Sequence, residues 1–269
     1  MERLMLIKLS AFDCAAQAWL NGVPLLRVEA DGGTATLAVH EYVCSGANHL
    51  QLEIDASGTP AGQPRRLRTL QPRDGRLPYA DCRLLLPRFD HAADESRVRT
   101  LGELSWHGEA GQRVGAPIGL RADVDLPIAF PRWRWLDAPV AQSRAELRER
   151  AQQLLEQLRD DLARGQTELY LQTCRLRSEE LALAYQREVG QFTQELRDHL
   201  LRVGELAQWQ WSVPEPDALQ LRAIAGGKLL ECLDADGLPA LRTQPAADGT
   251  TWRLPLRVAA LEGRLYVLR

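Results

Sequence analysis

The sequence predicts two domains: an N-terminal all-β sandwich, and a C-terminal α+β domain in which helices precede an antiparallel meander. Three observations support this. Apolar residues alternate with period two, between turn signals, over residues 1 to about 130. The period becomes helical between residues 143 and 203, and short strands return from Trp209 onward. We expect the sandwich over residues 1–130, an aromatic and proline-containing linker over 131–139, and the α+β domain over 140–269.

The clearest local signal is the dipeptide Asn21-Gly22, which lies between two apolar runs. Both central residues of a type I′ turn need positive φ, and Asn and Gly adopt it most easily. We therefore expect a two-residue hairpin turn here, with Trp19 directed into the sandwich core. The strands expected in this half are Arg3–Leu9, Ala15–Leu20, Val23–Ala30, Thr34–His40, His49–Ile54, Arg83–Leu86, Leu101–Trp106, Ile118–Val124 and Leu126–Phe130.

A second turn motif precedes the strand that begins at His49. Gly46 and Asn48 lead into a run in which Leu50, Leu52 and Ile54 alternate with polar residues. The segment from Trp19 to Ile54, with its Trp-x-Asn-Gly hairpin and its Gly-x-Asn-x-Leu-x-Leu strand start, resembles the galactose-binding-like jelly rolls that accompany many glycosidases. The resemblance implies a jelly-roll sandwich and leaves carbohydrate binding open. Ligands of that superfamily lie on variable loops, so no sugar-binding residue is carried over.

Helical signals dominate the next segment. Ser143 and Glu146 have the spacing of a capping box, and the leucine stripe that follows ends at Gly165. A short helix is expected over Glu168–Arg175. A longer helix is expected from Ser178, because its apolar stripe runs without a break as far as Val203.

The last segment reads as antiparallel strands joined by Gly-containing turns. The expected strands are Leu219–Ala225, Lys228–Leu233, Leu238–Thr243, Trp252–Ala260 and Arg264–Leu268. Helices followed by such a meander make an order of elements similar to the NTF2-like (cystatin-like) cone fold, over about residues 140–269. The resemblance implies a curved sheet with helices on one face and a pocket between them. The residues that could line this pocket, or fill it as core, are Tyr185, His199, Trp209, Trp211 and Trp252.

Charge, apolar runs and cysteine spacing limit the kinds of partner and the location that we expect. The net charge is −3, which argues against a general nucleic-acid binder. No run approaches the length of a membrane span, and the first residues read as a strand and not as a signal peptide, so no membrane partner and a cytoplasmic location are expected. The five scattered cysteines contain no CxxC pair, which favours free thiols.

No recognised catalytic motif stands out. Nucleophile elbows, phosphate loops and paired metal-ligand histidines are absent from the sequence. A metal site from His40, His49 and Glu41 is conceivable, but surface or satisfied histidines fit the spacing better. The acidic pairs Asp160-Asp161 and Glu179-Glu180, and Asp234 with Asp236, are expected on helix surfaces and beside a turn. We therefore assign no catalytic residue, cofactor or metal ligand.

These observations favour a non-enzymatic interaction module that binds another protein, such as a bacterial immunity or adaptor protein. The rival hypothesis is an enzyme or small-ligand receptor that uses the cone pocket. Arginine and tryptophan anchor protein interfaces most strongly. The candidate partner-binding residues are therefore Arg65, Arg66 and Arg68 in an arginine-rich loop, with Trp133 and Trp135 in the linker. A solvated loop and a packed connector are the structural alternatives, and a homo-oligomer stays open.

Overall fold

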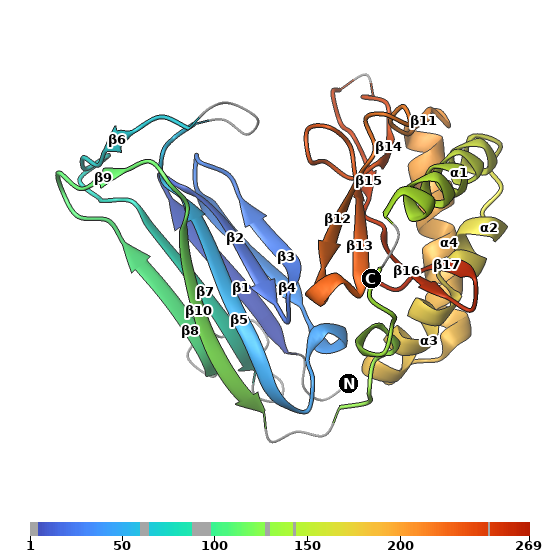
Figure 1. Cartoon of the computed structure of the whole chain (residues 1–269), viewed down its shortest axis with the longest axis horizontal. Helices are drawn as coiled ribbons and strands as arrows, with labels where there is room; N and C mark the ends of the chain where they lie inside the picture. The colour runs from blue at the N-terminus through green and yellow to red at the C-terminus, as the bar shows by residue number, and fades with distance from the viewer. Residues whose placement is uncertain (1–4, 60–64, 88–97, 127–129, 142–143, 247) are drawn as a thin grey trace. The chain divides into compact units, whose positions relative to one another are not determined.

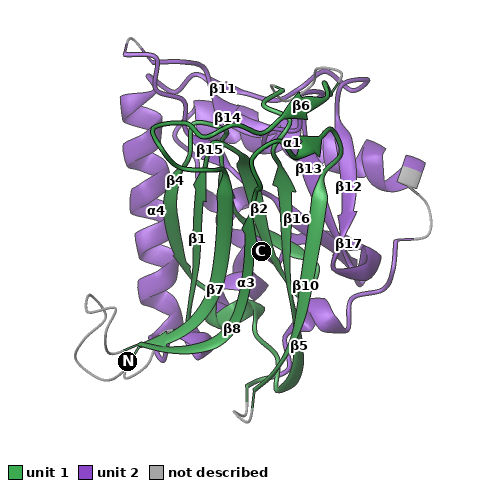
Figure 2. Cartoon of the chain, turned by 90° about the vertical axis from the view of Figure 1, so that its left-hand side faces the viewer, with its two compact units in different colours: residues 1–131 green, residues 132–269 purple. Residues whose placement is uncertain are grey.

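A computed structural model of the chain describes residues 5–59, 65–87, 98–126, 130–141, 144–246 and 248–269. The chain divides into two compact units, residues 1–131 and 132–269, which Figure 2 colours separately. As Figure 1 shows, unit 1 is built mainly from strands, with a short 3-10 helix (His40–Tyr42) between β4 and β5, and in unit 2 helices precede the strands. None of the described helices has the length and hydropathy needed to cross a bilayer.

Unit 1 contains two four-stranded antiparallel sheets. Their orders are β4-β1-β7-β8 and β10-β5-β2-β3, and the short strands β6 and β9 pair separately. Every second residue is buried along β1 and β5, as expected for sheets with one face on a core. The strands are β1 (Leu6–Phe12), β2 (Ala15–Leu20), β3 (Val23–Val28), β4 (Gly33–Ala38), β5 (Gly46–Asp55), β6 (Arg68–Thr69), β7 (Tyr79–Pro87), β8 (Val98–His107), β9 (Arg113–Val114) and β10 (Ile118–Leu126). The prediction of a β-rich N-terminal half is confirmed, although Leu126 ends β10 and residues 127–129 of the last expected strand lie outside the described residues.

The hairpin expected at Asn21-Gly22 is present. Leu20 pairs with Val23, and the two turn residues have φ of 52° and 75°. The Asn21 side chain also reaches the second motif: its Nδ2 donates to Asn48 Oδ1 at 2.8 Å, and its Oδ1 accepts from the His49 N–H at 2.9 Å. The two motifs that were recognised separately in the sequence thus hold each other in place.

Trp19 does not point into the core, which corrects the prediction. In β2 the buried residues are Ala16, Ala18 and Leu20, so Trp19 lies on the opposite face and is half-buried. Side chains alternate across a strand, and the small alanines occupy the inner face here. The size of the Trp19 side chain suggested burial. However, side chains alternate between the two faces of β2, and this alternation places Trp19 on the face opposite Ala18 and Leu20.

In unit 2 a short 3-10 helix (Arg134–Leu136) comes first. Among the described residues four α-helices follow it: α1 (Arg144–Ala163), α2 (Glu168–Thr173), α3 (Arg175–Ala184) and α4 (Val189–Leu206). Gly165 follows α1 with φ of 72°, as predicted, and the Gln166 N–H bonds back to the Asp161 carbonyl. Ser143 of the expected capping box lies outside the described residues.

The single long helix expected from Ser178 is wrong. The structure starts α3 at Arg175 and breaks the chain between α3 and α4 at Gln186, which has φ of 52°. The Arg187 N–H bonds to the Ala182 carbonyl and the Gln186 N–H to the Leu183 carbonyl, the pattern of a Schellman helix end. Because glutamine does not signal a left-handed residue, the continuous apolar stripe concealed this break.

The strands of unit 2 form two sheets, where one meander was expected. They are β11 (Trp211–Ser212), β12 (Gln220–Ile224), β13 (Leu229–Leu233), β14 (Leu241–Thr243), β15 (Arg253–Leu254), β16 (Arg257–Leu261) and β17 (Arg264–Val267), in the orders β11-β14-β15 and β12-β13-β16-β17. The expected strand over 252–260 is split by Pro255, which has no N–H to donate to a ladder. Buried residues of α1 and α4, such as Leu155 and Leu200, share one core with Leu230 of β13.

Candidate functional site

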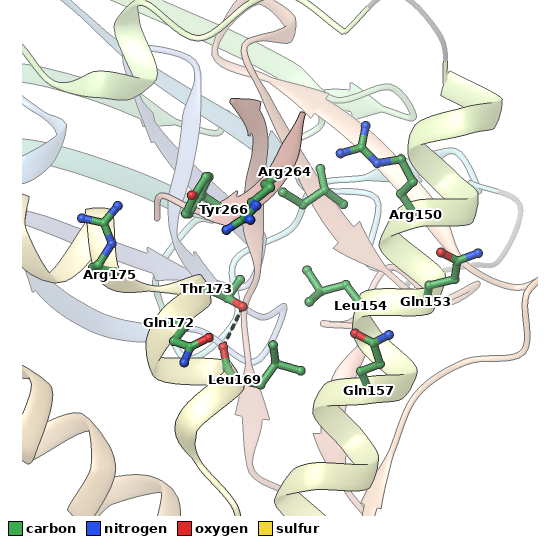
Figure 3. Close-up of a pocket in the computed structure, with 11 residues that line it drawn as sticks. Arg150, Gln153, Leu154, Gln157, Leu169, Gln172, Thr173, Arg175, Arg264 and Tyr266 are labelled. Atoms are coloured by element: carbon green, nitrogen blue, oxygen red, sulfur yellow. Dashed lines mark hydrogen bonds between the residues drawn. The ribbon is translucent and has the colours of Figure 1, made fainter. Parts of the chain in front are cut away.

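A groove of about 560 Å³ lies within unit 2, between α1 on one side, α2 and the start of α3 on the other, and strand β17 (Figure 3). Among the described strands of its sheet, β17 alone contributes to the lining. The lining residues are Arg150, Gln153, Leu154 and Gln157 from α1, Leu169, Gln172 and Thr173 from α2, Arg175 from α3, and Arg264, Leu265 and Tyr266 from β17. The side walls are therefore helical, and a strand closes one end.

Helix and turn geometry bring these residues together. On α1, Arg150, Leu154 and Gln157 follow one another at spacings of four and three, which places them on one side of the helix. Strand β17 follows a two-residue turn in which Glu262 and Gly263 have φ of 48° and 73°. This turn folds β17 back along β16 and leaves its other side facing away from the sheet.

Three leucines supply the apolar part of the groove. Leu154, Leu169 and Leu265 are each partly buried and pack against the core of unit 2. They come from α1, α2 and β17 in turn, and Figure 3 shows Leu154 and Leu169 facing each other across the groove. Since the core holds them from behind, they form a fixed apolar surface.

Arginine and amide side chains supply the polar part. Arg150 donates to the Gly263 carbonyl at 2.8 Å and lies 3.9 Å from Glu146. Arg175 pairs with Glu179 at 2.6 Å on the exposed surface of α3. Arg264 is exposed and has no ion pair among the described residues. No carboxylate is present among the described residues that line the groove, so its rim is basic in a chain whose net charge is −3.

The only hydroxyl groups on the described lining belong to Thr173 and Tyr266. Thr173 Oγ1 donates to the Leu169 carbonyl at 2.8 Å, the bond drawn dashed in Figure 3. This bond directs the threonine hydroxyl back into its own helix. The groove is thus equipped for recognition by guanidinium groups, amides and apolar contact.

The five aromatic residues proposed for a cone pocket do not line this groove. Trp211 belongs to the buried core, and Trp252 packs against it. Tyr185 lies 6.2 Å from the Phe192 ring, between centroids, at the α3–α4 junction, and His199 is exposed on α4. The structure therefore distributes these residues over the unit and does not gather them into one site.

Trp209 has a local structural role. Its ring lies so close to Gly204 that a Cβ built there would come within 2.1 Å of Trp209 Cζ3. The Trp209 N–H also bonds to the Gly204 carbonyl at the end of α4. Only glycine leaves room for a ring at this position, so Trp209 covers the end of a helix.

Trp133 and Trp135 are buried, which corrects their proposal as partner-binding residues. Their exposed fractions are 1% and 2%, and the Arg269 guanidinium lies 5.6 Å and 6.0 Å from the two rings. Arg269 in turn pairs with Glu180 at 2.5 Å, and Glu180 Oε1 accepts from the Arg134 N–H. Compact unit 2 begins at Arg132, so this part of the expected linker belongs to its interior.

The arginine-rich loop is tied to the sandwich through several of its side chains. Arg68 pairs with the buried Asp13 and donates to the Asp13 carbonyl at 3.1 Å. Arg65 pairs with Asp55 at 3.0 Å. Arg66 is exposed and its side chain makes no ion pair among the described residues. Of the three candidates, Arg66 is the one whose guanidinium pairs with no carboxylate in the part of the chain that the structure describes.

The acidic and histidine candidates also have structural partners. Glu180 is buried, where a helix surface was expected, because Arg269 and a backbone N–H neutralise and bind its carboxylate. Asp234 accepts from the Asp236 and Leu238 N–H groups at 2.9 Å each and pairs with Arg242. His49 lies 2.7 Å from Asp123. Within the described ranges, no three His, Cys, Asp or Glu residues are placed to hold a metal.

The groove was missed because its residues are spread from Arg150 to Tyr266 in the sequence. They come from three separate stretches of the chain, 150–157, 169–175 and 264–266, and no local motif links these stretches. Comparison with protein families, curated proteins and solved structures finds no match to this chain.

Proposed function

We propose that this chain is a binding protein that acts without turnover, and that its groove receives an acidic segment of another protein that also carries an apolar side chain. One observation carries the proposal: three leucines form an apolar surface beside three arginines, with no carboxylate on the described lining. A ligand complementary to both parts is amphipathic and anionic.

The rim residues suit such a ligand chemically. Guanidinium groups bind carboxylates through two parallel hydrogen bonds, and these charge-assisted bonds are stronger than neutral ones. Gln153, Gln157 and Gln172 can each donate and accept, which matches the N–H and C=O groups of a peptide. Arginine and tyrosine are also residue types that concentrate binding energy at protein interfaces. Arg264 and Tyr266 are therefore the expected anchors.

Fold-level features support this class of function. The eight long strands of unit 1, in two antiparallel sheets of four, match the strand count of a jelly roll. In unit 2 the helices precede the strands and share one core with them, in keeping with an NTF2-like assignment. Both folds serve widely as binding modules, and we propose a cytoplasmic immunity or adaptor protein as the biological setting.

A small-ligand receptor is the second candidate. The groove volume of about 560 Å³ lies within the range of small-molecule sites, roughly 300–1,000 Å³. An aliphatic carboxylate would satisfy the same leucines and arginines. Competition between such a carboxylate and a peptide separates the two candidates, since only a peptide would gain from contacts along the whole groove.

Selection from a random peptide library on the immobilised full chain tests the proposal. We expect the selected peptides to be enriched in Asp and Glu next to an aliphatic residue. The charge reversal Arg264→Glu should weaken their binding about tenfold or more, because a repulsive charge replaces an attractive one. The matched control is Arg202→Glu, which reverses an exposed arginine on α4, outside the described lining of the groove.

Equal binding by the wild type and both variants would place the ligand elsewhere and overturn the proposal. Selection of peptides without acidic enrichment would do the same. Both variants should keep the wild-type melting temperature, which ensures that a loss of binding is not a loss of fold.

A further inference from the structure

We propose that the bound segment is extended and adds to the free edge of β17 as an antiparallel strand with alternating acidic and apolar residues. This inference rests on the proposed function and specifies its ligand. Three observations support it. They are the backbone groups of β17 that are not bonded to β16, the side chains on the two faces of β17, and the positive charge of the groove lining.

Strand β17 is an edge strand. It is the last member of the order β12-β13-β16-β17, and among the strands that the structure describes it pairs with β16 alone. An edge strand exposes N–H and C=O groups on one side, which can pair with another chain. The groove lies against this strand, because Arg264, Leu265 and Tyr266 all line it.

The register shows which backbone groups are open. A β-bulge places Leu268 and Arg269 opposite Arg257: both of their N–H groups donate to the Arg257 carbonyl. Antiparallel pairs alternate between bonded and non-bonded, so Tyr266 with Ala259 is a bonded pair and Leu265 with Ala260 is not. The N–H and C=O of Leu265 therefore point away from β16.

Leu265 is the open position on this edge. In the β16–β17 register neither its N–H nor its C=O is directed at β16, and no turn, loop or side-chain hydrogen bond to either group occurs among the described residues. On one side of it, the Gly263 carbonyl already accepts from Arg150 at 2.8 Å. On the other side, Val267 is fully buried. An added strand therefore has one defined anchoring pair, opposite Leu265.

The faces of β17 define the sequence pattern of the ligand. Arg264 and Tyr266 share one face, and Leu265 lies on the other, against the core of unit 2. Side chains of an added strand continue these two faces. A residue opposite Leu265 should be apolar, and its two neighbours should be acidic, where the guanidinium of Arg264 can pair with them.

The probe is the peptide Ac-Glu-Val-Glu-Val-Glu-NH2, with Ac-Lys-Val-Lys-Val-Lys-NH2 as its charge-reversed control. Binding to the full chain is measured by calorimetry, and each peptide nitrogen is then methylated singly. In an antiparallel addition the valine N–H groups face β17. Methylation at the valine opposite Leu265 should weaken binding about tenfold or more, while methylation at a glutamate should change it less than about threefold.

A second readout uses the protein backbone. On binding, amide hydrogen exchange of Leu265 should slow about tenfold or more, whereas the Tyr266 amide is already bonded to β16 and should change little. The variant Leu265→Pro removes the outward N–H without removing a β16–β17 bond. Leu265→Ala keeps that N–H and is the control for lost packing.

The outcomes separate the two levels of the proposal. If neither peptide binds, or if both bind equally, the acidic ligand and the proposed function are overturned together. If the acidic peptide binds and depends on Arg264, but methylation effects are uniform along the peptide and the Leu265 amide is unchanged, the function stands and strand addition is overturned. Losses confined to methylated glutamates would support strand addition in the parallel direction.

Discussion

Arginine side chains have different roles in two regions of the molecule, the loop between Arg65 and Arg76 and the groove of unit 2. In the loop between Arg65 and Arg76, several arginines that are close in sequence are bound into unit 1: Arg68 pairs with Asp13, and Arg76 lies 4.5 Å above the Phe12 ring. In the groove of unit 2, three arginines that are far apart in sequence converge on one surface. The clustering of arginines in the sequence therefore did not predict which guanidinium groups are available to bind a partner.

The difference lies in whether the neighbouring carboxylate is buried. Asp13 is buried, and a buried carboxylate requires a cation and hydrogen bonds to offset its desolvation. It therefore recruits Arg68, and Arg73 approaches it at 3.6 Å. Arg264 has no such neighbour among the described residues, so its guanidinium is free to meet a ligand. We call an arginine that pairs with a buried carboxylate in either unit, such as Arg68 or Arg269, a structural arginine, and an arginine of the groove lining a groove arginine. Four predictions test this division.

The largest expected effect concerns a structural arginine of unit 2. Glu180→Ala would leave the buried Arg269 guanidinium without its carboxylate. Removing one partner of a buried pair costs about 3–5 kcal/mol. Urea unfolding of the full chain measures this loss. The neighbouring variant Glu179→Ala, which breaks exposed pairs, should cost less than about 1 kcal/mol, and equal losses from the two variants would contradict the assignment.

The next effect concerns the arginine-rich loop. Arg68→Ala should destabilise the protein by about 1–3 kcal/mol, because it leaves the buried Asp13 carboxylate without its main partner. Arg66→Ala removes an exposed arginine two residues away and should stay within about 0.5 kcal/mol. Thermal unfolding of the two variants compares them directly. If Arg66→Ala were the more damaging change, the loop would have to be reinterpreted.

A pH-dependent effect should follow from Asp234. Burial raises the pKa of this carboxyl, but hydrogen bonds from Arg242 and from the Leu238 and Asp236 N–H groups outweigh it and hold the pKa below its usual value. A lowered folded-state pKa contributes stability above the unfolded value of about 4, and this contribution is lost as the pH falls through the folded pKa. Asp234→Asn should therefore destabilise the protein at pH 7 and much less at pH 2–3. Asp236→Asn is the control, and a difference between wild type and Asp234→Asn that does not change with pH would contradict the prediction.

The smallest effect on stability should come from a groove arginine. Arg264→Ala should change the free energy of unfolding by less than about 0.5 kcal/mol, since Arg264 is exposed and has no ion pair among the described residues. The same variant should weaken binding of the acidic peptide probe. A large loss of stability would show that Arg264 stabilises the fold. This result would contradict its assignment as a groove arginine, on which the proposed site is based.

Local turn chemistry was readable without the structure. Asn21-Gly22 and Gly165 were predicted as a hairpin turn and a helix end, and both have the expected positive φ. Asn and Gly predict such positions well, because few other residues adopt positive φ at low energetic cost. Gln186 ends α3 in the same conformation, yet glutamine has no such preference, so the surrounding packing decided that break.

The sequence predicted the burial of single residues less well than it predicted the turns. Trp19 was predicted in the core and lies on the other face, while Glu180 was predicted on a surface and is buried. The side on which a strand residue lies depends on the pairing register. The burial of a carboxylate depends on a cation that can be distant in sequence, as Arg269 is from Glu180.

By itself the sequence determined the β-rich first half, the helices before the strands in the second half, and the turns at glycine and asparagine. These features follow from periodicity and from φ preferences, which act over a few residues. The tertiary structure alone decided that Trp133 and Trp135 are interior, that Arg68 is paired, and that Arg150 and Arg264 meet at one groove. Those outcomes depend on which distant groups meet when the core closes, because desolvation and charge pairing act between neighbours in space.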